Sequence, residues 1–349
     1  MISRKTSGEK DRDSNLELYR CIVMLMIVAH HFVFHSGLMD VMSEEPTSWR
    51  SVYLYLFGAW GKVGIDCFVL ITGFFMCKSS ISSRKFVKLL FQIEFYKIVI
   101  YILFLLFGYD DFSFESCAKT IMPIVYVSDD FVGCFILFYL FIPYLNILIN
   151  NMHKKQHGFL ILLCLFVYSL LPLFPYVEVF QNYVIWFAVL YIISSYLRLY
   201  GLSVLFKYAT EWTVLSILIT SASICFFLFY GMKWPYYLVF DANKVLALAV
   251  SVCSFTFFRK LKVQHSKIIN IIGSSTFGVL LIHDSSWAMR TWLWQDVINA
   301  QHWYYSNIYF YSIAYVLFVF VICSLIDMVR YNTIEKPLFR LIDSIRERY

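Results

Sequence analysis

Charged side chains are scarce in this sequence. Asp, Glu, Lys and Arg together make up 15% of its 349 residues, whereas an ordinary soluble domain carries about 25%. Hydrophobic residues reach 60% and aromatic residues alone 20%. This composition excludes a soluble globular domain and predicts an integral membrane protein. The net charge of +6 is explained by loop charges and does not indicate a nucleic-acid partner.

Three further absences narrow the class of protein. The nine cysteines form no Cys-x-x-Cys pair and most lie in apolar runs, so we expect no metal and no redox centre. No internal repeat is present, which argues against an inverted-repeat transporter. No small-x-small cleavage site follows the first apolar stretch, so we expect a retained signal anchor rather than a cleaved signal peptide.

Apolar stretches long enough to cross a bilayer occur ten times. They cover residues 16–37, 53–77, 86–108, 131–150, 159–175, 183–200, 212–231, 237–258, 268–284 and 307–330. We therefore predict an all-α membrane protein, a bundle of about ten transmembrane helices that forms a single domain over 1–349. An even number of crossings places the two tails, 1–15 and 331–349, on the same side.

The cationic residues indicate which side that is. Six alternate segments between the predicted spans, tails included, hold 22 of the 29 Lys and Arg residues. The opposite loops hold few cations and are acidic, with Asp129 and Asp130 among their carboxylates. The positive-inside rule then predicts that both termini are cytoplasmic.

Arg20 and His31 lie in the first span with ten residues between them. On an α-helix, eleven steps of about 100° return to within about 20° of the starting direction and climb about 16 Å. Both side chains are therefore expected on one face, Arg20 near the inner surface and His31 well into the bilayer. An ionisable residue inside a span is costly and is by default a candidate functional residue.

Other spans bring ionisable groups to a similar depth. Asp66 and His283 are both expected in the outer half, as is Lys244 near the outer end of its span. We interpret these groups, with His31, as the lining of a polar cavity, since several isolated buried charges would be costly. Small residues in the second span, among them Gly64, are expected to press Asp66 against the helix that carries His31.

Structural roles remain open for several of these residues. His30 is equally well explained as a hydrogen-bonded interior histidine, and His283 as an interfacial one. Asp66 has Lys62 one turn away as an alternative partner. Lys244 and Asp241 have the spacing of a helical ion pair, which favours a structural role for both.

Three stretches carry a resemblance to one known family. Residues 15–31 are similar to its Arg/Lys, ten residues, His signature. Residues 61–75 resemble its glycine-rich segment with a central Asp, with Thr72 in place of the usual Ser, and 83–88 match the basic turn that follows. Residues 275–283 are similar to its late Ser-Gly-His stretch, and 334–337 also fit. The family is the acyltransferase 3 family of polytopic membrane O-acyltransferases.

The resemblance implies an activity. Members transfer an acyl group, usually acetyl, from cytoplasmic acyl-coenzyme A to a hydroxyl of a surface glycan or lipid-linked sugar. It further implies acetyl-CoA as co-substrate, a surrounding of membrane lipid, and a multi-pass place in the bacterial inner or plasma membrane. No extra soluble domain is present to indicate which acceptor is used.

The candidate site residues take roles within that activity. His31 is expected to act as general base, because an imidazole titrates near neutrality, and Asp66 to orient it. A transient acyl-histidine at His31 is the open alternative.

Cationic residues are expected to bind the phosphates of coenzyme A. They are Arg20, Arg84, Lys85 and Lys88. The three residues assigned to substrate binding or support are His30, His283 and Lys244.

Two other function classes fit the same composition. A transporter or flippase for a glycan or lipid would also have ten spans and a polar interior. A membrane sensor or scaffold would use the buried His and Asp groups as pH-responsive elements. Product formation that depends on acyl-coenzyme A distinguishes the enzyme from both.

Overall fold

The computed structural model describes residues 13–122, 131–174, 177, 179 and 182–346, and these contain helices but no strand. The predicted acidic pair Asp129 and Asp130, and most of the N-terminal tail, lie outside these residues. The α-helices are α1 (Ser14–His35), α2 (Leu38–Glu44), α3 (Trp49–Gly58), α4 (Gly61–Met76), α5 (Ser83–Leu106), α6 (Phe114–Ile121), α7 (Phe131–Asn150), α8 (Lys154–Leu165), α9 (Tyr183–Leu199), α10 (Ser203–Lys207), α11 (Ala209–Phe229), α12 (Val245–Lys260), α13 (Lys267–His283), α14 (Trp287–Thr291), α15 (Ile308–Arg330) and α16 (Lys336–Arg346).

Fewer helices qualify as membrane spans than the sequence predicts. In the described residues seven are long and apolar enough to cross a bilayer, or eight if α13 and the segment Trp287–Trp303, bent by 98°, form one span. These eight coincide with eight of the ten predicted spans. Of the other two, α9 has only 17 residues, and α12 begins at Val245 because the residues before it form turns.

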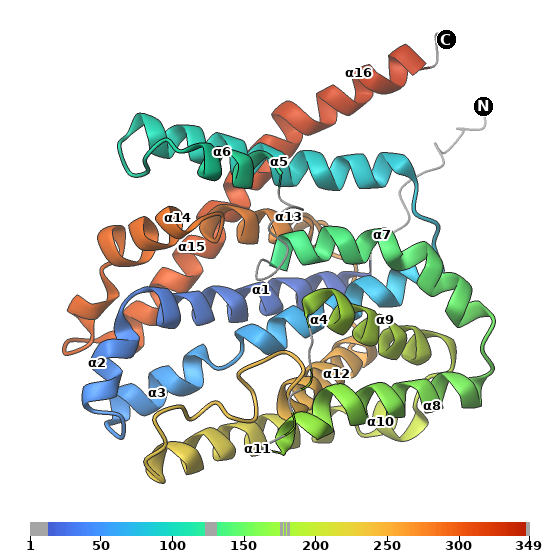
Figure 1. Ribbon diagram of the computed structural model, residues 1–349, viewed down its shortest axis with the longest axis horizontal. Coiled ribbons are helices and arrows are strands. Elements are labelled where there is room, and N and C mark those ends of the chain that lie inside the picture. The colour runs from blue at the N-terminus through green and yellow to red at the C-terminus, as the bar shows by residue number, and fades with distance from the viewer. Residues whose placement is uncertain (1–12, 123–130, 175–176, 178, 180–181, 347–349) are drawn as a thin grey trace.

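The last membrane helix continues beyond its predicted end. A π-helical turn, Tyr331–Glu335, joins α15 to α16, so the predicted tail 331–349 is helical as far as Arg346. The segment Ile308–Arg346 counts 39 residues, which at about 1.5 Å per residue is almost twice the thickness of a hydrocarbon core. The start of α1 and the end of α16 lie toward the same end of the molecule (Figure 1).

Helix α1 is the centre of the bundle and packs against α3, α4, α12, α13 and α15 (Figure 1). Glycines permit the close approach on one side: a side chain at Gly58, Gly61 or Gly64 would collide with Val33, His30 or Ile27 of α1. The sequence prediction that these small residues pack helices together is confirmed for these three. Dispersion contacts rather than the hydrophobic effect hold helices together in lipid, so close backbone approach is stabilising.

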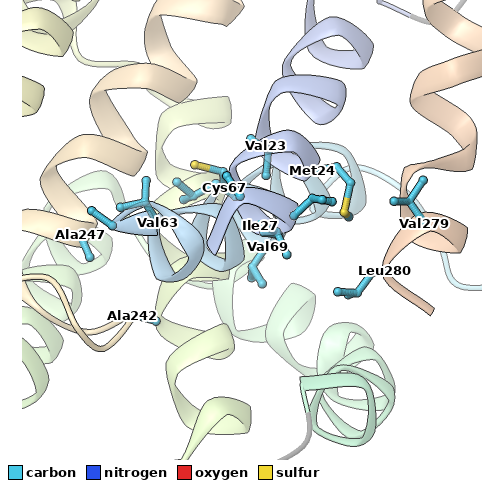
Figure 2. Packing of buried hydrophobic residues seen from close by; sticks show 14 of the residues in the cluster. Val23, Met24, Ile27, Val63, Cys67, Val69, Ala242, Ala247, Val279 and Leu280 are labelled. Carbon is cyan, nitrogen blue, oxygen red and sulfur yellow. The ribbon is translucent and has the colours of Figure 1, made fainter. Parts of the chain in front are cut away.

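An apolar layer crosses the bundle at the level of α1 between Arg20 and His31. Met24 and Ile27 lie on the face that carries Arg20 and His31, and both are buried. Figure 2 shows Met24 directed at Val279 of α13, with Ile27 beside it. We call these three residues the apolar plug, because they separate the two ionisable ends of one helix face.

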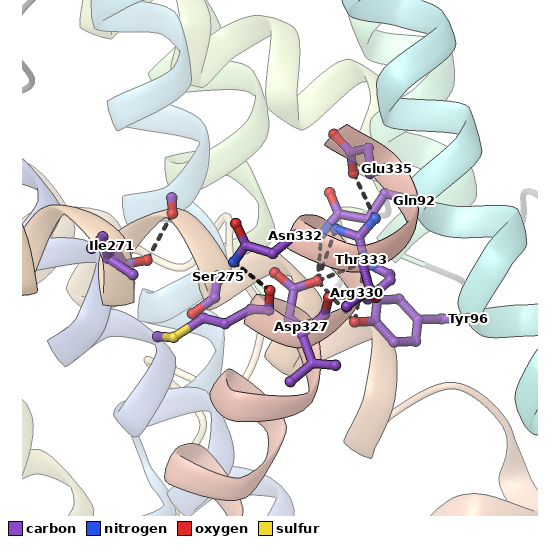
Figure 3. A network of polar contacts seen from close by, with 12 residues as sticks. Gln92, Tyr96, Ile271, Ser275, Asp327, Arg330, Asn332, Thr333 and Glu335 are labelled. Carbon is purple, nitrogen blue, oxygen red and sulfur yellow. Dashed lines mark hydrogen bonds and ion pairs between the residues drawn. The ribbon is translucent and has the colours of Figure 1, made fainter. Parts of the chain in front are cut away.

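A buried ionic network ties α15 to α5 (Figure 3). Arg330 donates to Asp327 at 3.0 Å and to Glu335 at 2.5 Å, while Tyr96 donates to Asp327 at 2.8 Å. All three charged side chains are buried. Such a network is tolerated in a membrane helix only when its members satisfy one another. Gly278 of α13 completes it by leaving room for the Asp327 carboxylate.

We expect Gly278→Ala to destabilise the protein by about 1–3 kcal/mol, because the new methyl group must displace the Asp327 carboxylate from its network. The measurement is the midpoint of thermal unfolding in detergent. The matched control is Gly158→Ala in α8, where the added carbon meets Tyr196 at an ordinary 3.7 Å and the helix gains about 0.5–1 kcal/mol. Equal midpoints for the two variants would contradict the packing described here.

Candidate functional site

Two histidines from separate helices meet at one end of the bundle. His31 lies near the end of α1, and His283 is the last residue of α13. The Nδ1 atom of His31 is 3.0 Å from the Nε2 atom of His283. His283 is fully buried, whereas the His31 side chain keeps 13% of its surface exposed. Two residues predicted at a similar depth are therefore in contact, and they form the centre of the candidate site.

A hydrogen bond within α13 fixes the protons of this pair. His283 Nδ1 lies 2.6 Å from the Val279 carbonyl oxygen. A carbonyl only accepts, so Nδ1 of His283 carries the proton and Nε2 of the neutral ring is an acceptor. His31 must then donate from its own Nδ1. This tautomer leaves Nε2 of His31 as a lone pair with no hydrogen bond to any described residue, which is the state required of a general base.

The carboxylate beside His31 is Asp284, which the sequence predictions did not include. Its Oδ1 atom is 3.7 Å from His31 Nδ1 and also pairs with the guanidinium of Arg290 in α14. Asp284 lies in the bend that follows α13 and Arg290 in the short helix after that bend, where the apolar span has ended. The Arg290 guanidinium thus holds the Asp284 carboxylate in place. The carboxylate faces Nδ1 of His31, which would share the positive charge of a protonated ring.

His35 extends the cluster by one helical turn. Its ring centre is 4.9 Å from that of His31, and ligating atoms of His31, His35 and Asp284 lie within 4.8 Å of one another. Such a trio has the composition of a metal site. However, Asp284 already forms an ion pair with Arg290, and the positive charge of Arg290 would repel a divalent cation. The arrangement therefore fits proton handling better than metal binding.

Asp66 is buried away from His31, in contrast to the predicted support of the imidazole. Its Oδ1 atom accepts a hydrogen bond of 2.8 Å from the indole of Trp186 in α9, and its Oδ2 atom has no partner among the described residues. Lys62, its alternative partner from the sequence, donates to Tyr183 instead. Gly61 of α4 lies against His30, and Asp66 follows more than one helical turn later, so its carboxyl is beyond the level of His31 and faces α9.

The two other predicted supporting residues have local partners. His30 Nδ1 lies 2.7 Å from the carbonyl oxygen of Gly58, which matches the interior hydrogen-bonded alternative. Lys244 is the residue before α12, with its ammonium 5.5 Å from the ring centre of Tyr237. The helical ion pair predicted with Asp241 does not form, because the chain from 236 to 244 is not helical.

Arg20 and His31 share one face of an unbroken helix, as the sequence predicts. Arg20 pairs with Glu17 at 3.2 Å, and Glu17 in turn packs on Gly273 at the start of α13. Both ends of this face therefore point toward α13. The apolar plug closes the space between them.

The basic cluster at the start of α5 faces α16. Arg84 forms an ion pair with Asp343, and the Lys88 ammonium is 5.0 Å from the ring centre of Phe339. Lys85 donates to the carbonyl oxygen of Ser80 at 3.3 Å. These predicted donor-binding cations thus have partners within the chain, and Arg84 would have to release Asp343 to bind a phosphate.

Two arginines that the sequence predictions did not single out lie around one aromatic ring. The guanidinium carbons of Arg198 and Arg259 are 4.3 Å and 5.1 Å from the ring centre of Phe74. No carboxylate pairs with either one among the described residues. Two neighbouring guanidinium groups without an anion are typical of a phosphate site. In the sequence both arginines belong to basic segments between predicted spans, and the positive-inside rule alone was enough to explain their presence there.

Comparison with known families gives one match. The profile of the family described as an acyltransferase domain, acyltransferase 3, matches residues 13–327, which is nearly the whole chain. No curated protein and no solved structure shows significant similarity.

We expect Asp66→Asn to leave stability nearly unchanged, because the amide oxygen can still accept the Trp186 hydrogen bond. Asp66→Ala should cost about 2–4 kcal/mol, from the cavity and the unpaired indole donor. Thermal unfolding in detergent measures both. Asp241→Ala, which removes a carboxylate from an irregular segment, is the control and should change stability by less than about 0.5 kcal/mol. Equal losses for Asn and Ala would show that the negative charge itself is required.

Proposed function

The chain belongs to the acyltransferase 3 family, and from this premise we propose that it is a membrane O-acyltransferase with His31 as general base. The acyl group is acetyl and the donor is acetyl-coenzyme A on the cytoplasmic side. The acceptor is a hydroxyl of a cell-surface or lipid-linked glycan. The observation that supports this proposal best is the tautomer of His31, whose free Nε2 lone pair is set by the contact with His283.

The proposed transfer can be written as balanced steps in which the residues of this cluster take up and return one proton. Nε2 of His31 takes the proton of the acceptor hydroxyl while its oxygen attacks the thioester carbonyl. The carbon–sulfur bond then breaks, and the coenzyme A thiolate takes the proton back from the imidazolium. Products are the ester and free coenzyme A, and His31 returns to its starting state. Asp284, 3.7 Å from Nδ1, stabilises the transient imidazolium.

Support for His31 is assigned to His283 and Asp284 rather than to Asp66. His283 sets the tautomer and Asp284 balances the charge, which together are the tasks of the carboxylate in a Ser-His-Asp triad. Asp66 keeps a structural task, the connection of α4 to α9 through Trp186.

The donor approaches from the end of the bundle that holds Arg20. Arg20, Arg84, Lys85 and Lys88 remain candidates for its phosphates, and the pair Arg198 and Arg259 is added because no carboxylate competes there. The thioester must reach His31 past the apolar plug. Since Met24 is unbranched and flexible, its rotation is the smallest movement that opens this path.

We expect His31→Ala and His31→Gln to lower transfer by about 10²–10⁴-fold, the usual contribution of a positioned general base. Purified protein, radiolabelled acetyl-coenzyme A and a crude pool of glycan and lipid-linked acceptors measure it. His35→Gln, which changes the neighbouring ring on the same helix, should keep most activity. Full activity of His31→Gln would reject His31 as the base. Label that moves no faster with wild type than without protein would reject the enzyme.

His283 is proposed as a positioning residue, so its replacement should affect kcat and not KM. His283→Leu removes the acceptor for His31 Nδ1, and we expect a loss in kcat of about 10–100-fold with a changed pH profile. His283→Gln offers an amide oxygen in its place and should recover part of the loss. A purely structural role would predict lower thermal stability for both variants and an unchanged pH profile.

A further inference from the structure

A cavity of about 570 Å³ opens where the end of α5, helix α6 and helix α14 meet. This volume is in the range of sites that bind small molecules, about 300–1,000 Å³. The cavity adjoins the histidine cluster along the chain: Ser285 and Trp287, both in its wall, directly follow Asp284 across the bend after α13. It is therefore a second compartment next to His31 and not part of the contacts described above.

The wall of the cavity is rich in aromatic rings. Tyr101, Tyr109, Trp287 and Trp292 all line it. Trp292 is held against Tyr109 at 6.0 Å between ring centres and against Phe104 at 5.6 Å. Trp287, in contrast, is 74% exposed, so its face is available for stacking.

Polar groups between these rings lack partners of their own. The hydroxyls of Tyr101 and Ser285 are buried and make no hydrogen bond to any described residue. A buried hydroxyl without a partner costs about 1–3 kcal/mol, so a ligand that supplies the missing bonds is favoured. Charges of both signs also line the cavity: Lys97, Lys119, Asp110 and Asp296.

We propose that this cavity binds the sugar ring of the acceptor. The inference rests on the proposed acyl transfer and adds the place in the chain where the acceptor sugar binds. A sugar ring presents an apolar face of C–H groups, which stacks on Trp or Tyr, and a rim of hydroxyls, which pairs with the free groups of Tyr101 and Ser285. A lipid tail would leave those hydroxyls unpaired. A polyphosphate would meet two carboxylates, Asp110 and Asp296, which offset the charges of the two lysines in the wall.

The position of the cavity also suits the proposed acyl transfer. A sugar held by Trp287 and Ser285 lies on the Asp284 side of the cluster, and the Asp284 carboxylate is 3.7 Å from Nδ1 of His31. The cationic pair Arg198 and Arg259 belongs to the ends of α9 and α12 that are predicted to be cytoplasmic. Donor and acceptor would therefore approach His31 from opposite ends of the bundle.

Three variants test the site. Trp287→Ala should raise KM for the acceptor about tenfold, because a stacked ring contributes roughly 1 kcal/mol or more. Tyr101→Phe and Ser285→Ala each remove one oxygen and should raise it about threefold to tenfold. None of them should change KM for acetyl-coenzyme A or its slow hydrolysis without acceptor. The matched control is Trp49→Ala, which removes an exposed tryptophan (81%) at the start of α3 and should leave all constants unchanged.

A binding measurement separates this inference from the proposed function. Tryptophan fluorescence of wild type and Trp287→Phe is followed during titration with neutral and N-acetylated disaccharides in detergent. A saturable change that is lost in Trp287→Phe supports the sugar site even if wild type transfers no acetyl group. Wild type that transfers acetyl normally, with an unchanged acceptor KM in Trp287→Ala and Tyr101→Phe, overturns the sugar site and leaves the proposed function standing. No saturable change together with no transfer overturns both.

Discussion

One hydrogen bond, from His283 to the carbonyl of Val279, determines the chemistry that the histidine cluster can perform. Because a carbonyl has no proton to give, the proton position on His283 is settled, and through it the proton position on His31. The neighbouring Asp284 and Arg290 then supply balanced charge at the edge of the cluster. A helix carbonyl thus orients His283, and His283 in turn orients His31.

The same helix, α13, also connects the two ends of the molecule. At its start Gly273 packs on Glu17, the partner of Arg20, and in its middle Gly278 packs on Asp327. Its last residue is His283. One helix therefore contacts the cationic end of α1, the buried ionic network and the candidate base, and glycines stand at two of these three contacts.

Helices and helix faces could be predicted from the sequence much better than the contacts of single side chains. Length and hydropathy placed seven of the membrane helices, or eight with the bent pair, and helical periodicity placed Arg20 and His31 on one face. His31 and His283 were expected at a similar level, and the structure brings them into contact. Asp66 was expected there too, but its place depends on how α4 packs between α1 and α9, which no pattern in the sequence encodes.

Other parts of the site depend on tertiary packing that local patterns do not contain. Asp284 and Arg290 come together only because the chain bends by 98° after α13. Arg198 and Arg259 are 61 positions apart and meet around Phe74, a ring with no distinguishing feature in the sequence. Helix α12 begins later than predicted because the apolar residues before it form irregular turns instead of helix.

The apolar plug has a consequence for the cell as well as for the reaction. A continuous water-filled channel between Arg20 and His31 would let ions leak and discharge the electrical gradient across the membrane. The buried side chains of Met24, Ile27 and Val279 leave no polar path there, and water and ions do not readily enter an apolar constriction. An acyl transfer with donor and acceptor on opposite sides, as proposed above, would then leave the electrical gradient intact.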